Sequence, residues 1–111
     1  MTNIVIQMKN TNFNKQITQT NFQGKDPKVK QLVKAFLKLK TEQEVANFLR
    51  DLLTPPEIEE FSNRLEIAKL LLTRKSYLKI AKETGTSTTT VTRVAQWLFR
   101  GCGGYWKVLH Q

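Results

Sequence analysis

Hydrophobic residues recur at helical spacing through most of the chain after residue 25, and a helix-start signal precedes each run. The pair Asp26-Pro27 is an N-cap with proline at the first helical position, which predicts a helix over 27–39. The segment Thr41-Glu42-Gln43-Glu44 fits the capping-box spacing and predicts a second helix over about 42–53. Their apolar stripes are Val29, Leu32, Val33, Phe36 and Leu37, and Val45, Phe48, Leu49, Leu52 and Leu53.

A second capping box, followed by two prolines, marks the start of a third helix. Thr54 is its predicted N-cap, Pro55 its first residue and Glu57 the acidic member of the box. Apolar residues then recur three and four positions apart at Ile58, Phe61, Leu65, Ala68 and Leu72. Ile67, Leu70 and Leu71 make the second half of the helix apolar on nearly every side. Such a helix is expected to be buried, and a position between two subunits would account for the pattern.

From Ser76 the pattern changes to two short helices separated by a tight turn. Ser76 opens the first helix, Gly85 supplies the positive φ of the turn, and Ser87 caps the second helix. The small and branched residues expected where the two helices pack are Ala81, Val91 and Val94. This arrangement predicts a helix-turn-helix over about 76–99.

The second helix of this motif has one apolar and one polar face. The apolar face is Val91, Val94, Ala95 and Leu98. The polar face is Thr89, Thr92, Arg93 and Gln96, with Thr88 at the helix start. Hydroxyl, amide and guanidinium groups so placed suit base edges in the major groove. Basic residues that could hold the flanking phosphates are Arg74, Lys75, Lys79 and Lys82. The alternative is a plain packing motif whose threonine-rich start is only a solvated cap.

The charge of the chain agrees with a polyanionic partner. Lys and Arg number 18 against 9 acids, for a net charge of +9, which suits DNA, RNA or an acidic membrane. Six lysines fall in 25–40, seven acids in 41–66, and eight bases against one acid in 67–111, as expected for a folded body with one cationic face. The lysines of the first helix are interpreted as a solvated face, with phosphate contact as the alternative.

Composition also bounds the domain organisation and excludes several functions. Asn, Gln and Thr make up 13 of the first 24 residues, which predicts a disordered polar arm over 1–24 before a helical domain over 25–111. The arm is either a frayed terminus or a contact for nucleic acid. No apolar run is long enough for a membrane span or a signal peptide, so a cytoplasmic, nucleoid-associated protein without membrane contact is expected.

Catalytic and metal chemistry find no support in the sequence. The only cysteine, Cys102, and the only histidine, His110, lie in the C-terminal tail, so no catalytic residue, metal site or cofactor is expected. Glycines from Gly101 end the last helix, and the apolar segment behind them is expected to pack across a dimer or, alternatively, to stack on bases.

These motifs resemble the Trp repressor superfamily, and more closely its YerC/YecD-like branch of small bacterial regulators. The resemblance spans roughly 28–109. It is carried by Leu52-Leu53-Thr54-Pro55 with Glu57, by Arg64-Leu65-Glu66-Ile67-Ala68, and by Glu83-Thr84-Gly85 with the run from Ser87 to Val94. It implies an all-α protein of about six helices, an intertwined homodimer, and paired recognition helices on a palindromic operator in double-stranded DNA.

The resemblance also implies positions for an effector pocket. Arg64 and Arg93 match the two arginines that hold the amino-acid corepressor in the Trp repressor, and Thr54 and Thr90 match further pocket positions. Val94 and Trp97 replace small residues of that pocket and fill space, which favours a protein that does not use tryptophan as corepressor.

The sequence therefore favours a sequence-specific transcriptional regulator of the repressor type. One alternative is a repressor that depends on tryptophan or another small molecule. An alternative from another class is a basic helical interaction or RNA-binding module.

Overall fold

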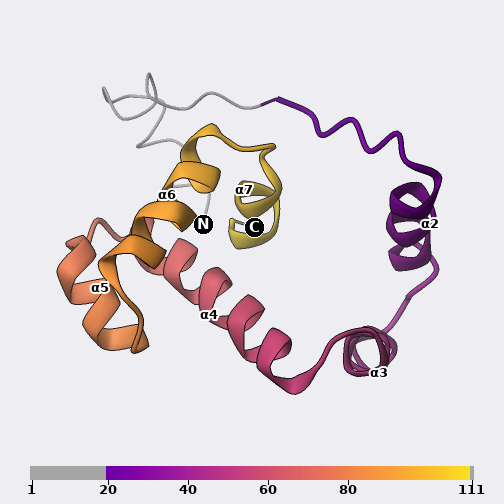
Figure 1. Cartoon of the computed structure of the whole chain (residues 1–111), viewed down its shortest axis with the longest axis horizontal. Helices are drawn as coiled ribbons and strands as arrows, with labels where there is room; N and C mark the ends of the chain where they lie inside the picture. Colours follow the sequence, from indigo (N-terminus) through magenta and orange to yellow (C-terminus); the bar gives the residue numbers. More distant parts are fainter. Residues whose placement is uncertain (1–19, 111) are drawn as a thin grey trace. The chain divides into compact units, whose positions relative to one another are not determined.

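The computed structural model describes residues 20–110, and this part of the chain contains six α-helices and no strand (Figure 1). The helices are α2 (Pro27–Phe36), α3 (Glu42–Leu52), α4 (Pro55–Leu71), α5 (Tyr77–Thr84), α6 (Thr88–Arg100) and α7 (Gly104–Leu109). The all-α class predicted from the sequence is confirmed. None of these helices is long and apolar enough to cross a membrane.

Local hydrogen bonds begin the first helices where the sequence predicts. The Asp26 carboxylate accepts the Lys28 N–H at 2.8 Å, and the Thr41 hydroxyl accepts the Glu44 N–H at 3.1 Å. The first capping box, at Thr41, differs in one detail, because the Glu44 carboxylate accepts the backbone N–H of Lys40, at 2.7 Å, rather than that of the cap residue. The signal therefore locates the start of α3 correctly, while its acidic member bonds one residue further back.

The first helix ends earlier than its apolar pattern predicts. α2 stops at Phe36 instead of residue 39. The N–H groups of Leu37 and Lys38 bond to carbonyl oxygens three residues back, at 3.1 Å each, so the chain tightens into a turn. Hydrophobic spacing thus continues past the end of the helix.

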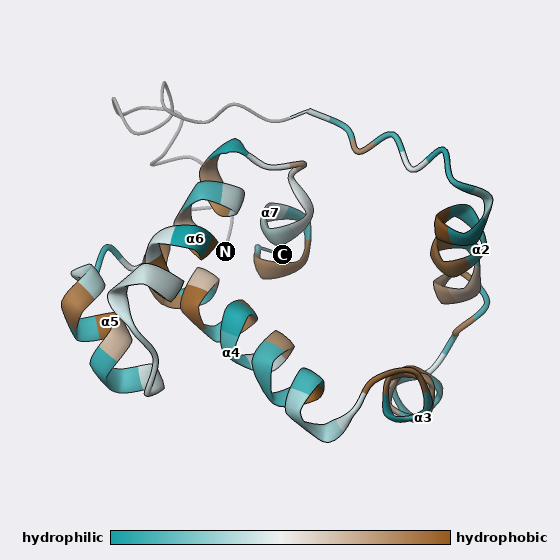
Figure 2. Ribbon diagram, in the orientation of Figure 1, coloured by the Kyte–Doolittle hydropathy of each residue, from teal (hydrophilic) through white to brown (hydrophobic). Residues whose placement is uncertain are grey.

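The described chain forms two units, of which one covers 22–62 and the other 63–110 with residues 20 and 21. No residue of α2 or α3 is buried. The rings of Phe36 and Phe48 meet edge to face with centroids 5.3 Å apart, but Val33 is 53% exposed and Phe61 46%. The apolar stripes of the 22–62 unit, drawn in brown in Figure 2, are therefore only partly covered within it.

The 63–110 unit holds the hydrophobic core. Its ten buried residues come from the second half of α4, the residue after it, α5 and α6: Ile67, Ala68, Leu71, Leu72, Ile80, Ala81, Val91, Val94, Ala95 and Leu98. None of the buried side chains among the described residues is polar or charged. The predicted burial of α4 is confirmed for its second half, while Leu65 remains 42% exposed.

The turn between α5 and α6 has the predicted conformation. Gly85 has φ 67° and ends α5, and the Thr86 N–H donates to the Ala81 carbonyl at 2.9 Å. The junction between α4 and α5 contains a second left-handed residue, Arg74, at φ 64°. Both junctions turn the chain sharply, the first with glycine and the second without it.

The C-terminal segment packs on its own chain. Tyr105, Trp106 and Leu109 of α7 lie against the core, and the Trp106 indole N–H donates to the Leu98 carbonyl at 2.6 Å. These side chains thus have contacts within their own chain, and the packing of this segment across a dimer stays a prediction. Gly101 follows the end of α6. Glycine is needed at this position because a methyl group there would overlap the Trp97 carbonyl oxygen.

The predicted polar arm lies mostly outside the described residues. Residues 20–24 have no helix or strand, and the Thr20 N–H donates to the Gly101 carbonyl at 3.0 Å. The disorder expected for 1–24 stays a prediction.

Replacing Gly85 with alanine should destabilise the protein by about 1–2 kcal/mol, because a Cβ is unfavourable at a left-handed φ even where space is open. Gly104→Ala is the matched control, since that glycine starts α7 with open space around its Cα. Denaturant unfolding of both variants measures the difference, and equal stabilities would contradict the role given to Gly85.

Candidate nucleic-acid interface

Helix α6 presents a polar face to solvent because its other face is held in the core. Val91, Val94, Ala95 and Leu98 are buried against the rest of the unit. The outward residues predicted from the sequence are all exposed: Thr88, Thr89, Thr92, Arg93 and Gln96. Since α6 also packs against α5, its rotation about its own axis is fixed. The two predicted faces of α6 are therefore present in the structure.

The start of α6 is ordered by hydroxyl groups. The Ser87 hydroxyl accepts the Thr90 N–H at 3.1 Å, as predicted for a cap, and lies 3.1 Å from the Thr90 hydroxyl. The Thr92 hydroxyl donates to the Thr88 carbonyl at 2.9 Å. Thr92 therefore keeps its methyl group and its oxygen lone pairs for an outside partner.

A shallow hollow of about 310 Å³ lies beside the outward face of α6. It is lined by Tyr77, Thr92, Ala95, Gln96, Phe99 and Arg100. Two of the predicted base-reading residues, Thr92 and Gln96, thus share a hollow with a tyrosine from α5. Sequence reasoning did not single out Tyr77, and its place directly after the Ser76 cap was the only signal that it begins a helix beside α6.

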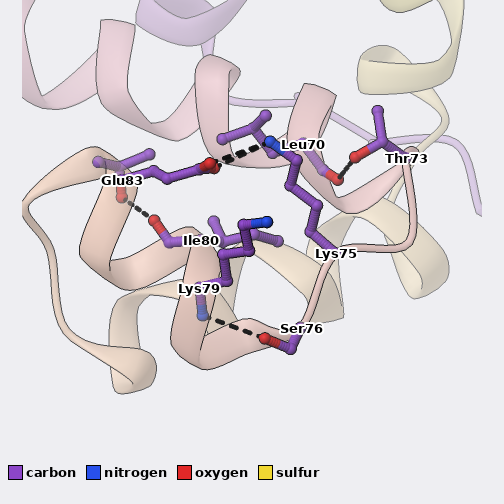
Figure 3. A network of polar contacts seen from close by, with 8 residues as sticks. Leu70, Thr73, Lys75, Ser76, Lys79, Ile80 and Glu83 are labelled. Carbon is purple, nitrogen blue, oxygen red and sulfur yellow. Dashed lines mark hydrogen bonds and ion pairs between the residues drawn. The ribbon is translucent and has the colours of Figure 1, made fainter.

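The lysines around α5 do not all have the same surroundings (Figure 3). The Lys75 ammonium contacts both carboxylate oxygens of Glu83, at 3.0 and 3.1 Å, across two turns of α5. Lys79 and Lys82 are exposed. Glu83 therefore balances the charge of Lys75, and of these three lysines the two exposed ones contribute most to the cationic surface.

Two residues matched to the effector pocket have structural partners. The Thr54 hydroxyl and backbone N–H both donate to Glu57 Oε1, at 3.0 and 2.9 Å, and the hydroxyl accepts the Glu57 N–H at 3.3 Å. The bond from the Thr54 N–H, and then that from its hydroxyl, hold the pKa of the Glu57 carboxyl below its ordinary value. This reciprocal pair is the capping box predicted for the start of α4, so Thr54 already serves helix capping.

Arg64 lies in the 63–110 unit beside an aromatic residue of α7. Burial raises the pKa of the Tyr105 phenol, and the charge of the nearby Arg64 guanidinium opposes that rise. The phenol is therefore neutral at physiological pH, and it shares its surroundings with a cation.

The remaining residues matched to the effector pocket all lie on α6. Val94 is buried in the core, Thr90 is half-buried at the capped start, and Arg93 is exposed. The Trp97 indole is 61% exposed, with its Cε3 edge next to Gly101. The space-filling roles predicted for Val94 and Trp97 thus fall on one core residue and one surface residue.

The two C-terminal residues considered as catalytic or metal-binding groups are Cys102 and His110. Cys102 is exposed. The His110 Nδ1 lies 2.6 Å from the Trp106 carbonyl oxygen, which fixes the ring at the end of α7. No group of three or more His, Cys, Asp or Glu side chains among residues 20–110 is arranged to hold a metal ion.

An all-helical unit with a capped, outward-facing second helix after a left-handed glycine turn is the architecture of helix-turn-helix regulators. The family model "Trp repressor protein" matches residues 27–111, and the chain belongs to this family. The family consists of DNA-binding regulators and not of enzymes.

Two relatives support the same assignment. The uncharacterized protein YerC of Bacillus subtilis is 41% identical over 75 residues, which is 68% of this chain and 72% of that protein. The crystal structure of a TrpR-like protein from Eubacterium eligens superposes with a TM-score of 0.70 at 43% identity, covering 76% of this chain and 87% of the other. The resemblance to the YerC-like branch is thereby confirmed.

Replacing Thr54 with alanine should cost about 1 kcal/mol of stability, because α4 loses its cap. A glutamate with a lowered pKa stabilises the fold at neutral pH, and that contribution is lost as the pH falls through the lowered value. The variant loses the hydroxyl bond to Glu57 but keeps the backbone N–H bond, which is the larger cause of the lowered pKa, so it should lose only slightly less stability than the wild type between about pH 5 and pH 3. Unfolding at these pH values measures both effects. Thr54→Ser keeps the hydroxyl and should behave like the wild type, whereas a stability at neutral pH unchanged in Thr54→Ala would exclude the capping role.

Proposed function

We propose that this protein is a sequence-specific transcriptional regulator, of the repressor type, that binds a palindromic operator in double-stranded DNA as a homodimer. The observation that carries the proposal is the outward face of α6, where Thr88, Thr89, Thr92, Arg93 and Gln96 are exposed while the opposite face is buried. A helix held in this way can enter the major groove without rearranging its own core.

Each exposed group on α6 has a chemistry suited to one part of the duplex. Gln96 can bond bidentately to adenine and Arg93 to guanine, while the Thr92 methyl suits contact with a thymine methyl because its hydroxyl is already used within the helix. Thr88 and Thr89 lie in the first turn, where unpaired backbone N–H groups favour a phosphate. Lys79 and Lys82 supply phosphate contacts on the α5 side.

Dimerisation is supported by the partly covered helices of the 22–62 unit. α2 and α3 have apolar stripes but no buried residue, and Phe61 and Leu65 on α4 are each more than 40% exposed. Apolar surface of this extent normally marks a protein interface. A second copy of the chain, as the family resemblance implies, would cover it and would set two recognition helices about one helical turn of DNA apart.

The protein is further proposed to act without tryptophan as corepressor. Val94 occupies core space and Thr54 is held in a capping box, so these positions already have structural roles. A repressor that responds to tryptophan or another small molecule is the second candidate, favoured by the Arg64 and Arg93 matches alone.

Selection of binding sites from randomised duplex DNA, combined with sizing of the protein by light scattering, tests the proposed regulator function. We expect a dimer that enriches a palindrome with half-sites about one helical turn apart. A monomer, or binding that depends on salt but not on sequence, would contradict the proposal and favour a basic interaction or RNA-binding module.

Binding of variants to the selected operator then distinguishes residues that contact bases from residues that contact phosphates. Thr92→Ala or Gln96→Ala should reduce discrimination at particular base pairs by about 1–3 kcal/mol. Lys82→Ala should weaken binding to all sequences and lower the salt slope by about one. Binding isotherms at several salt concentrations measure both quantities, and uniform losses for all three variants would contradict the face assignment.

Calorimetric titration with tryptophan tests the effector prediction. We expect no stoichiometric heat and no change in operator affinity, because Val94 and Thr54, at two of the matched pocket positions, already have structural roles in the core and in the cap of α4. Tight one-to-one binding by the wild type would overturn this and establish the second candidate.

A further inference from the structure

The first helix and the turn after it carry a row of lysines that the helix-turn-helix does not use, with Lys38 two residues beyond the end of α2. Lys30, Lys34 and Lys38 follow one another every fourth residue and, with Pro27, Gln31 and Ala35, line a shallow depression of about 510 Å³. All three lysines are exposed. Because a helix rises 1.5 Å per residue, Lys30 and Lys34 lie about 6 Å apart along α2. We call Lys30, Lys34 and Lys38 the lysine stripe.

The charge of the lysine stripe is not balanced within the described chain. Asp26 is the only acid between residues 25 and 40, and its carboxylate caps α2 by accepting the Lys28 N–H. None of the three lysines forms an ion pair with a carboxylate in the 20–110 region. Like charges four residues apart destabilise an isolated helix, so the repulsion between Lys30 and Lys34 lowers the stability of α2.

The lysine stripe also lies away from the surface that packs. The apolar side of α2 includes Phe36, whose ring contacts Phe48 of α3. Helical geometry places Lys34, two residues before Phe36, on roughly the opposite side of α2. A partner that packs on the apolar side of α2 therefore leaves the lysine stripe exposed to a different partner.

We propose that the lysine stripe is a second, sequence-independent contact with the phosphate backbone of duplex DNA. This inference rests on the proposed function. Three exposed lysines that line one depression suit a linear polyanion, and each phosphate contact releases a condensed counterion. An anionic membrane fits less well, because the apolar side of α2 that would have to enter the bilayer already holds Phe36 against Phe48.

The test compares two triple variants that remove the same charge. Lys30→Gln/Lys34→Gln/Lys38→Gln removes the lysine stripe, and glutamine has nearly the same helix propensity as lysine. Lys25→Gln/Lys69→Gln/Lys107→Gln removes three other exposed lysines. Binding to a labelled random duplex of about 30 base pairs and to the selected operator is measured by fluorescence anisotropy between about 50 and 300 mM salt. Circular dichroism verifies that both variants are folded.

We expect the stripe variant to lower the salt slope by about 2–3 per chain in contact and to weaken random-duplex binding at least tenfold at about 0.1 M salt. Its preference for the operator over random DNA should not change. The control variant should change the slope by less than half as much. Equal slopes for the two variants would overturn the inference, as would tighter stripe-dependent binding to single-stranded RNA or to phosphatidylserine vesicles.

The same measurements separate this inference from the proposed function. If the stripe variant binds like the control while Thr92→Ala loses operator preference, only the lysine stripe is excluded. If the wild type binds no duplex, the regulator proposal fails and the inference fails with it.

Discussion

Burial of one side of α6 is the interaction on which the rest of its unit depends. Val91, Val94, Ala95 and Leu98 fill the space beside α5 and the end of α4, and no buried polar group assists them in the described chain. Full burial of an aliphatic side chain contributes roughly 1.5–3 kcal/mol, so these few contacts are a large share of the stability of a small domain. They also determine which side of α6 faces solvent, and stability and the proposed DNA recognition therefore share one set of contacts.

Sharp junctions determine where each helix of this unit begins and ends. Gly85 adopts a left-handed conformation at little cost, whereas Arg74 adopts a similar one with a Cβ present and bears about 1–2 kcal/mol of strain. Such a residue persists where the packing of the neighbouring helices offsets its conformational cost. At the far end, Gly101 allows the chain to pass close to the Trp97 carbonyl, and the Trp106 indole then fastens α7 to the last turns of α6.

Features set by neighbours along the chain could be read from the sequence, whereas those set by packing could not. The caps at Asp26, Thr54 and Ser87 and the turn at Gly85 depend on bonds that span two to five residues, and each was predicted correctly. The polar and apolar sides of α6 followed from periodicity. The Lys75–Glu83 pair, the place of Tyr77 beside α6 and the intrachain packing of α7 depend on how elements meet. A linear pattern does not contain that information.

The two tryptophans of the chain stand in opposite surroundings. The Trp97 indole is mostly exposed to water on α6, the helix with the outward polar residues. Trp106 is half-buried, hydrogen-bonded to the Leu98 carbonyl, and its ring centroid lies 6.5 Å from that of Phe99. Their fluorescence emission spectra should therefore differ, with the emission maximum of the half-buried Trp106 at shorter wavelength. The protein thus carries two intrinsic fluorophores, one that senses what approaches α6 and one that senses whether the core beneath it is intact.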